Sequence, residues 1–206
     1  MNRQTPGLRI RPTRKQKTTA KSRQPKAAVK QRPEPIIFTA RPYVPQRDGE
    51  RVSRYHTELL LLQNELWRSL SSLPNDPQEM RRALERRQEG ANWVRQLRMM
   101  SGRGEGTVLM LDAPGGEPAG YVFVTESFDP LNYERMGVIG ELFVEEAWRS
   151  RGAGSQMLRA AEKWLMDRGV RSFQVFVTKT NAEAVDLYRN NGYATFDYRM
   201  VKRLST

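Results

Sequence analysis

The segment from Val138 to Leu165, VIGELFVEEAWRSRGAGSQMLRAAEKWL, constrains the fold of this chain more than any other part of it. An apolar run of strand length leads through a short basic turn with two glycines into a stripe of apolar residues at helical spacing (Met157, Leu158, Ala161 and Leu165). A strand that is followed so closely by an amphipathic helix buries the apolar stripe of that helix against the sheet. The segment therefore predicts an α/β architecture.

The flanking patterns extend this unit into a mixed sheet. Alternation and apolar periodicity predict strands at 106–113, 119–126, 137–144 and 172–178, and helices at 48–70, 77–100, 152–168 and 181–190. A short β-rich run at 35–43 precedes them, and a final strand pair is expected from Gly192 to Arg203. Because a hairpin is followed by a strand–helix–strand–helix unit, the sheet should contain one parallel crossover.

Capping residues mark the expected helix starts. Asp76 directly precedes a proline, which places an N-cap carboxylate before the first turn of the second helix. Thr180 and Glu183 have the spacing of a capping box, which starts the last helix beside Asn181. Asn181 and Tyr188 then share one face, two turns apart. Taken alone, Tyr188 is interpreted as a partly buried core residue and Asn181 as a cap.

The composition excludes several kinds of chemistry. The chain has no cysteine, so it has neither disulfides nor a thiolate metal site, and we expect no metal. Its one histidine, His56, lies in YHTELLLLQNELW and is interpreted as a residue that decorates or packs a helix. No apolar run approaches the roughly 20 residues of a membrane span, and the N-terminus lacks the apolar core of a secretory signal. We therefore expect a cytoplasmic protein without membrane contact.

Most of the net charge of +12 belongs to residues 1–34, which carry eleven Lys and Arg and one acid. This segment has few large apolar residues and no sustained period, so we predict a disordered basic tail followed by a folded domain at 35–206. Three roles stay open for the tail: a solvated arm, a weak contact with nucleic acid such as RNA, or an organelle transit peptide. The domain itself is nearly balanced in charge.

The basic turn is a candidate anion site. Glycines at 152 and 154 let backbone N–H groups approach a ligand, and the start of a helix adds free N–H groups and the positive end of its dipole. Arg149 and Arg151 add positive charge at the rim. A dinucleotide fingerprint is excluded because Met157 stands where its third glycine should be. From these residues alone, an ordinary left-handed turn is the open alternative.

Two stretches taken together resemble one family. The run VEEAWRSRGAG, from Val144 to Gly154, resembles the acetyl-CoA signature of the GNAT N-acetyltransferases, Arg/Gln-x-x-Gly-x-Gly/Ala after a strand. The run NAEAVDLYRNNGY, which begins at Asn181, resembles the next motif of that family, with its asparagine, tyrosine and Gly-aromatic pair. The resemblance covers about 36–204 as a fold, and its specific part is 137–196.

This resemblance implies both a fold and a reaction. The fold is the GNAT acyl-CoA acyltransferase fold, a central mixed, mostly antiparallel sheet with one parallel, splayed strand pair and helices on both faces. The reaction is acetyl transfer from acetyl-CoA to an amine acceptor, by direct attack of the amine on the thioester without a covalent enzyme intermediate. The anion at the basic turn would then be the pyrophosphate of coenzyme A.

The resemblance also implies individual site residues. The implied cofactor-binding residues are Leu142, Phe143 and Val144 for the pantetheine arm, Arg149, Ser150, Arg151, Gly152, Ala153, Gly154 and Ser155 for the pyrophosphate, and Asn181 and Tyr188. Tyr188 would lie near the thioester sulfur and act as the general acid for the leaving thiolate.

The base that removes a proton from the acceptor amine is less clearly marked. Glu141 lies within an otherwise apolar strand, where we expect it to face the same way as Ile139 and Phe143. An acid in such a setting could act as the base, directly or through water. The alternative is a solvent-facing strand residue. Glu126, at the end of the preceding strand, is a second candidate.

The acceptor and the assembly are open at this stage. The resemblance places the acceptor near the helices of 48–100 and the last strands, and small amines, protein N-termini and lysines all fit that description. Two other functions compete with catalysis: a nucleic-acid- or ribosome-associated binding protein that uses the basic tail, and an acyl-CoA-binding regulator without turnover. We expect a monomer or a homodimer.

Overall fold

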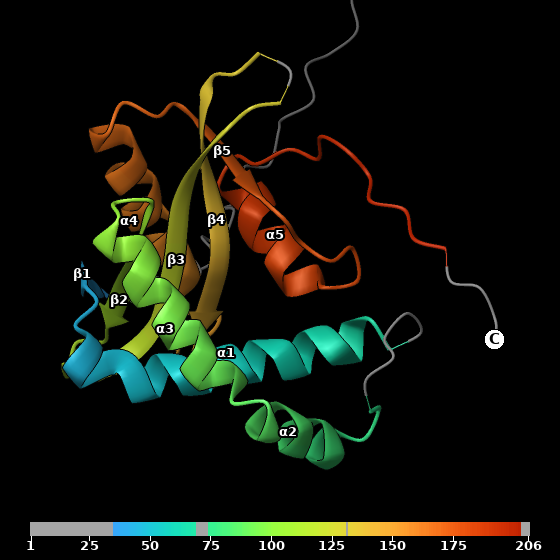
Figure 1. Cartoon of the computed structure of the whole chain (residues 1–206). Coiled ribbons are helices and arrows are strands. Elements are labelled where there is room, and N and C mark those ends of the chain that lie inside the picture. The colour runs from blue at the N-terminus through green and yellow to red at the C-terminus, as the bar shows by residue number, and fades with distance from the viewer. Residues whose placement is uncertain (1–34, 69–73, 131, 203–206) are drawn as a thin grey trace, which may run out of the picture. The chain divides into compact units, whose positions relative to one another are not determined.

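A computed structural model describes residues 35–68, 74–130 and 132–202. The expectations for the basic tail at 1–34 lie outside these residues. Within the described ranges, one sheet of five strands has the order β1-β2-β3-β4-β5 (Figure 1). The elements are β1 (Thr39–Pro42), α1 (Pro45–Leu66), α2 (Pro77–Arg86), α3 (Glu89–Gly102), β2 (Gly106–Asp112), β3 (Pro118–Phe128), β4 (Arg135–Val144), the 3-10 turn η1 (Glu146–Trp148), α4 (Ala153–Asp167), β5 (Ser172–Val175) and α5 (Ala182–Asn190).

The strand pairing confirms the predicted mixed sheet. The pairs β1–β2, β2–β3 and β3–β4 are antiparallel, and β5 runs parallel to β4. The β2–β3 hairpin turns at Gly116, which has a φ of 86°, a conformation that glycine adopts without a steric penalty. The parallel pair is joined by α4, as a crossover requires. The sheet is therefore mostly antiparallel with one parallel pair.

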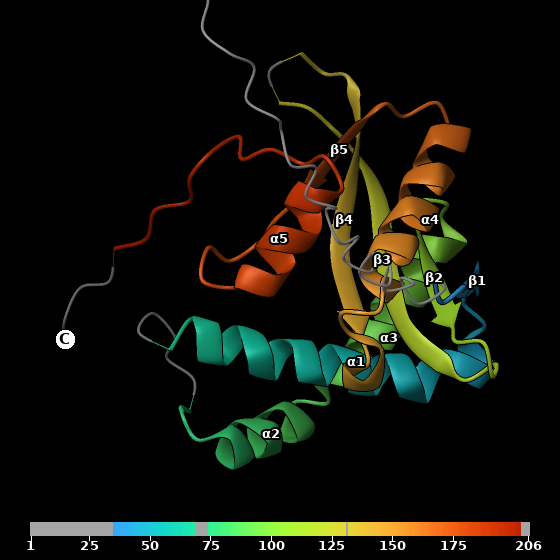
Figure 2. The same ribbon diagram turned by 180° about the vertical axis from the view of Figure 1, so that it is seen from behind.

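Helices cover both faces of the sheet, so there are two cores. The α1-side core lies under α1 and α3, in front of the sheet in Figure 1, and the α4-side core lies under α4, which faces the viewer in Figure 2. The α1-side core comprises Val52, Tyr55, Leu97, Val108, Met110, Tyr121, Phe123 and Phe143. The α4-side core contains Val122, Val124, Ile139, Met157, Leu158, Ala161 and Leu165, among others. The apolar stripe predicted for α4 is thus buried on the sheet.

A β-bulge in β4 corrects one expectation about Glu141. The register passes from Phe123 opposite Glu141 directly to the next pair, Val124 opposite Ile139, so that Gly140 is an extra residue in β4. Ile139 therefore packs in the α4-side core while Glu141 lies on the opposite face of the sheet. The expectation that Glu141 faces the same way as Ile139 is wrong. Its predicted alignment with Phe143 is right, since no bulge separates those two residues.

The predicted helix at 77–100 is two helices. It breaks at Gln88, whose φ of 53° is left-handed, and α3 starts at the next residue. The break brings Gly90 against α1, where a Cβ on that glycine would lie 2.2 Å from the hydroxyl oxygen of Ser53. This close approach is a tertiary contact, and helical periodicity does not report it. The predicted cap at Asp76 is confirmed, because its side chain accepts a hydrogen bond from the amide of Glu79 at 2.8 Å.

The C-terminal segment corrects two further expectations. No strand forms in the described residues 193–202, although a strand pair was predicted there, and Phe196, Tyr198 and Met200 are each more than 80% exposed. Their alternation is typical of a strand, but a strand also needs a partner for its backbone. The predicted capping box at Thr180 is wrong, whereas the interpretation of Asn181 as a cap is confirmed, because its side chain accepts a hydrogen bond from the amide of Ala184 at 3.2 Å.

The start of α1 is held by a buried carboxylate that the sequence did not mark as special. Asp48 is 1% exposed and accepts hydrogen bonds from the Arg41 guanidinium at 2.8 and 3.1 Å and from the amide of Val44 at 2.8 Å. Burial alone would raise the pKa of Asp48, but these hydrogen bonds together with one from Arg47 outweigh it and lower the pKa. The cluster ties α1 to β1.

Candidate active site

The candidate site is the point at which the parallel strands separate. β4 and β5 pair only from Met136 opposite Ser172 to Ile139 opposite Val175. Beyond Ile139, β4 continues to Val144 and remains paired with β3, but among the described residues no strand pairs with its other edge. Leu142, Phe143 and Val144, the predicted pantetheine segment, belong to this open stretch. Unpaired backbone groups at the carboxyl end of a parallel pair can hydrogen-bond to an extended ligand.

The basic turn lies directly beyond the end of β4. Ser150 and Gly152 both have left-handed φ angles, 57° and 86°, and α4 begins at the residue after Gly152. The first amides of an α-helix have no acceptor within the helix, so they are available to an anion at this end. The turn and the open edge of β4 thus meet at the same end of the sheet. This arrangement suits a ligand with an extended arm and a phosphate group.

The two arginines of the turn are exposed and lie over aromatic rings. The Arg149 side chain donates a hydrogen bond to the carbonyl of Val144 at 3.1 Å, and its guanidinium lies 5.9 Å from the centre of the Phe143 ring. The Arg151 guanidinium lies 5.6 Å from the Trp148 ring. Cation–π contacts of this kind hold a charge in place without neutralising it. Both positive charges therefore stay available at the rim.

Gly154 and Ser155 connect the start of α4 to α5. A Cβ on Gly154 would lie 3.2 Å from both methyl groups of Leu187, so a side chain at this position would require Leu187 to shift by a few tenths of an ångström. The Ser155 hydroxyl accepts a hydrogen bond from the Asn191 side chain at 2.9 Å. The structure therefore gives both residues a packing role in addition to the predicted role in cofactor binding. These contacts set the spacing between the start of α4 and the C-terminal half of α5.

Tyr188 lies on α5 and packs against the α4-side core. Its ring makes an edge contact with Tyr193 at 5.6 Å between centroids, and burial raises the pKa of Tyr188 to about 12. Among the described residues its hydroxyl has no hydrogen-bond partner, whereas the hydroxyl of Tyr193 donates to Glu162 at 2.9 Å. Tyr188 therefore stays protonated over the whole physiological range and has a proton to donate. The Asn181 oxygen caps α5, which leaves its amide nitrogen for a ligand.

Glu141 is the centre of a polar cluster on the α1 face of the sheet. Its Oε1 lies 2.8 Å from Nδ1 of His56, and its Oε2 accepts a short hydrogen bond from the Tyr121 hydroxyl. The His56 ring stacks on Trp93 of α3 at 4.8 Å, with an angle of 15° between the planes. Burial, followed by the charge of Glu141, raises the pKa of Tyr121 well above its usual value. Glu141 is thus enclosed by partners and is not the solvent-facing strand residue of the alternative interpretation.

Sequence reasoning missed the contact between His56 and Glu141. The two residues are 85 positions apart in the chain, and only the packing of α1 across β4 brings them together. The signal that existed was weak: a single histidine beside the LLLL run of an amphipathic helix, and a single acid within an apolar strand. Neither pattern alone indicates a pair.

Glu126 lies at the other end of the sheet. It is opposite Gly137 in the β3–β4 register and forms ion pairs with Arg135 and Arg168. The hydrogen bond from Arg168, with help from Arg135, lowers the pKa of Glu126. A carboxylate that two arginines already neutralise is a poor proton acceptor, so the geometry argues against Glu126 as the base.

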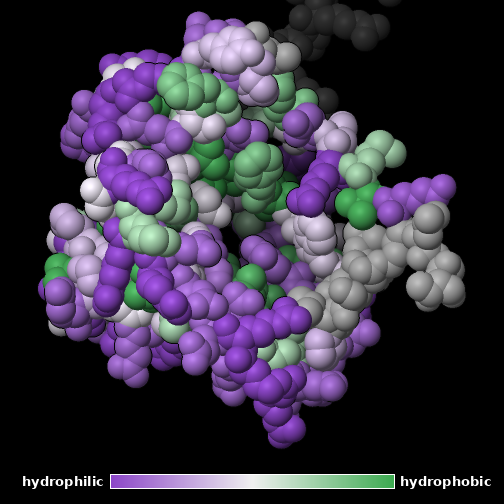
Figure 3. Space-filling view, viewed as in Figure 1, coloured by the Kyte–Doolittle hydropathy of each residue, from purple (hydrophilic) through white to green (hydrophobic). Residues whose placement is uncertain are grey.

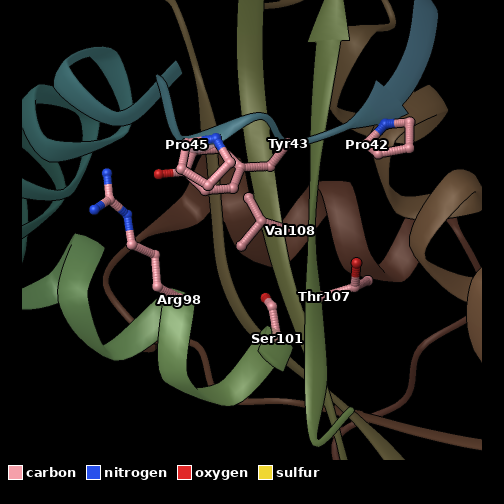
Figure 4. Close-up of a pocket in the computed structure, with 7 residues that line it drawn as sticks. All are labelled: Pro42, Tyr43, Pro45, Arg98, Ser101, Thr107 and Val108. Carbon is pink, nitrogen blue, oxygen red and sulfur yellow. The ribbon is translucent and has the colours of Figure 1, made fainter. Parts of the chain in front are cut away.

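The surface near the separated strands is hollowed and partly apolar. In the space-filling view a hollow lies between α5 and α1, and apolar side chains gather beside it (Figure 3). Phe176 and Val177, directly after β5, are exposed apolar residues of this region of the chain. A different cavity of about 290 Å³ lies where β1, α3 and β2 meet, lined by Tyr43 and Arg98 among others (Figure 4). It contains none of the predicted site residues.

Two further observations concern metal ions and membranes. No group of three or more His, Cys, Asp or Glu side chains in these ranges is placed to hold a metal ion. None of the helices within them is long and apolar enough to cross a membrane.

The fold and its open parallel pair define the class of the chain, an α/β protein with the acyltransferase fold. The profile of the acetyltransferase (GNAT) family matches residues 62–193, more than half of the chain. The chain therefore belongs to the GNAT family, as the sequence motifs predicted.

Known proteins agree with this assignment. A curated relative, the "Uncharacterized N-acetyltransferase YhfO" of Bacillus subtilis (strain 168), is 28% identical over 87 residues, which span 42% of this chain and 58% of the relative. A putative acetyl transferase from Pyrococcus furiosus superposes with a TM-score of 0.60 at 23% identity, over 82% of this chain and all of its own. A GCN5-related N-acetyltransferase from Ralstonia eutropha JMP134 gives 0.58 at 19% identity, over 81% and 98%. At these identities the solved structures show the fold alone.

Proposed function

We propose that the protein transfers the acetyl group of acetyl-CoA to a primary amine by direct attack within a ternary complex. The observation that carries this proposal is the joint placement of the open edge of β4 and the helix start at Gly152. An extended arm needs unpaired backbone groups, and a pyrophosphate needs free amides and positive charge. Acetyl-CoA has both parts, and membership of the GNAT family favours it as the acyl donor.

The cofactor would lie along the separated strands. The backbone of Leu142 to Val144 would pair with the pantetheine arm, and the turn from Arg149 to Ser155 would hold the pyrophosphate. Arg149 and Arg151 would screen its charge from the rim, where both are exposed. The side-chain nitrogen of Asn181, whose oxygen already caps α5, would be left to contact the cofactor.

The reaction needs a proton acceptor for the amine and a proton donor for the thiolate. Tyr188 would supply the proton to the thiolate, since burial keeps its hydroxyl protonated and no described residue competes for it. Deprotonation of the amine would take place on the opposite face of the sheet, where Glu141 lies. A donor and an acceptor on opposite sides of the acetyl group can act on the leaving and attacking atoms at the same time.

Calorimetric titration with acetyl-CoA, followed by an acetylation screen over small amines, peptide N-termini and lysine peptides, tests the proposal. We expect one binding site per chain and turnover with at least one class of amine. The double variant Arg149→Gln, Arg151→Gln should weaken binding by about tenfold or more, which corresponds to about 1.4 kcal/mol. Arg159→Gln, which removes an exposed charge from α4 beyond the turn, is the matched control. Absence of acetyl-CoA binding to the folded wild-type protein would refute the proposal.

A further inference from the structure

We infer that Nε2 of His56 is the atom that takes the proton from the acceptor ammonium, and that Glu141 orients the imidazole. This inference rests on the proposed acetyl transfer and deepens it, because it names the base. It also reverses the interpretation of His56 as a packing residue only and changes the role predicted for Glu141.

The hydrogen bonds of Glu141 determine which nitrogen of His56 is free. Both carboxylate oxygens are occupied, one by His56 Nδ1 at 2.8 Å and the other by the Tyr121 hydroxyl. An ionised carboxylate only accepts hydrogen bonds, so Nδ1 must donate its hydrogen to Glu141. The neutral imidazole then carries no hydrogen on Nε2, and that nitrogen is left as a lone-pair acceptor. Each Glu141 oxygen already accepts one hydrogen bond, so a proton arriving from an amine would compete with His56 or Tyr121 for that oxygen.

The free nitrogen of His56 has access to solvent. Within the described ranges Nε2 has no hydrogen-bond partner, and it is not among the buried polar side-chain atoms that lack one. The residue is 8% exposed, so the opening is narrow. A narrow opening at a lone-pair nitrogen is what a base in a partly closed site requires.

Trp93 covers one face of the His56 ring. Trp93 stacks on it at 4.8 Å, and the edge of Trp93 is in turn fixed against Phe123 at 5.3 Å. These contacts come from α3 and β3, while the hydrogen bond to Glu141 comes from β4. The imidazole is therefore positioned by a ring contact and a hydrogen bond before any substrate binds. Such preorganisation is what positions a general base.

The position of the pair along β4 connects it to the reaction. Glu141 is the second residue beyond Ile139, the last residue of β4 that pairs with β5, so it lies at the start of the open stretch. It is on the α1 face of the sheet, whereas Tyr188 packs on the α4 side. A thioester that lies in the opening would thus have His56 on one side and Tyr188 on the other.

The proposed step balances in protons and electrons. Nε2 of His56 accepts one proton from the ammonium, and the neutral amine nitrogen attacks the thioester carbonyl carbon and forms the C–N bond. The C–S bond breaks with its electron pair on sulfur, and the thiolate takes the proton of the Tyr188 hydroxyl. The second proton on the attacking nitrogen restores the phenol, and His56 releases its proton to solvent. The products are an amide, free coenzyme A and one proton.

The variant His56→Asn tests whether His56 is the base. The Asn side-chain nitrogen replaces Nδ1 as the donor to Glu141 and keeps the orientation of the carboxylate, while no atom replaces Nε2. We expect kcat to fall about 10²-fold or more with acetyl-CoA affinity within about twofold. Thr57→Val is the matched control: it lies next on α1 and loses only a hydrogen bond to the carbonyl of Ser53, at 3.0 Å. Its kcat should stay within about twofold.

The pH–rate profile separates the two roles. The titratable groups that face the imidazole are Glu141 on β4 and, through that carboxylate, Tyr121 on β3, while α3 contributes the uncharged Trp93. In Glu141→Gln the acidic limb of kcat/KM should persist, because the imidazole that accepts the proton is still present. In His56→Asn that limb should disappear.

The outcomes are distinct. A wild-type protein that binds no acetyl-CoA and acetylates no amine refutes the proposed function, and this inference falls with it. An active wild type together with a His56→Asn variant that keeps kcat and the acidic limb overturns the inference alone. Disappearance of the limb in Glu141→Gln, with its retention in His56→Asn, would return the role of base to Glu141.

Discussion

Replacement of Tyr188 by phenylalanine should lower turnover and leave stability unchanged, whereas the same replacement at Tyr193 should do the opposite. The two phenols are neighbours in the fold, with ring centroids 5.6 Å apart, but only Tyr193 has a hydrogen-bond partner, Glu162 at 2.9 Å. Tyr188→Phe keeps every ring contact and removes a hydroxyl that no described residue binds. The pair therefore separates a chemical role from a packing role within one part of the structure.

The magnitudes follow from the surroundings of each hydroxyl. If Tyr188 protonates the thiolate, its loss should reduce kcat by about 10²-fold, or about 2.7 kcal/mol in the barrier. The unfolding free energy of that variant should stay within about 0.5 kcal/mol of wild type. Tyr193→Phe loses a hydrogen bond to a carboxylate, which is worth about 1.5 kcal/mol and should lower Tm by roughly 3–6 °C. Its kcat should stay within about twofold.

Alkaline pH provides a check that is independent of activity. Burial raises the pKa of Tyr188 to about 12, above the value near 10 of an unfolded tyrosine, so the unfolded chain loses this proton first. Its contribution to stability is therefore complete below pH 10 and is lost as the pH rises from 10 to 12. Tyr188→Phe should lose less stability than wild type over this window, as measured by urea unfolding.

Steady-state kinetics with an identified amine and thermal unfolding of both variants decide the question. If Tyr188→Phe keeps kcat within a factor of two while it folds normally, Tyr188 is a core residue and the assignment of the general acid is refuted. If both variants lose activity and stability together, the two rings act only through packing.

Three further predictions concern other parts of the molecule. Gly154→Val should weaken acetyl-CoA binding at least about tenfold, as measured by calorimetry. Adding Leu187→Ala to this variant makes room for the new side chain but should not restore binding; if it does, Gly154→Val disturbed only the spacing of the two helices. Asp48→Asn should lower the free energy of unfolding in urea by about 3 kcal/mol near neutral pH, because it breaks the buried ion pair with Arg41. The difference between variant and wild type should vanish as the pH falls through the lowered pKa of Asp48, and an equal difference at pH 2 would contradict this explanation. A chain that begins at Pro35 should keep kcat/KM for a small amine within about twofold and lose most of its salt-sensitive retention on heparin; full retention would place the basic surface on the domain.

The order and type of most elements were predictable because they depend on local pattern. The apolar stripe of α4, the hairpin of β2 and β3 and the proline after Asp76 each report a structure within about twenty residues. The break of the second helix at Gln88 was not predictable in this way, since it accommodates the contact of Gly90 with Ser53 across two helices. Local pattern was also insufficient at 193–202, where alternation of apolar and polar residues predicted strands but none forms in these described residues.

The sequence by itself determined the mixed sheet, the glycine turn at the start of α4 and the family, since each of these depends on residues that are close together in the chain. The tertiary structure alone decided which polar residues of the candidate site are in contact. A single extra residue in β4, Gly140, turns Glu141 to the face on which α1 lies, and α1 then brings His56 to within 2.8 Å of its carboxylate. Hydrogen bonds between residues 85 positions apart depend on how helices cross a sheet, and the periodicity of a single segment carries no information about that crossing.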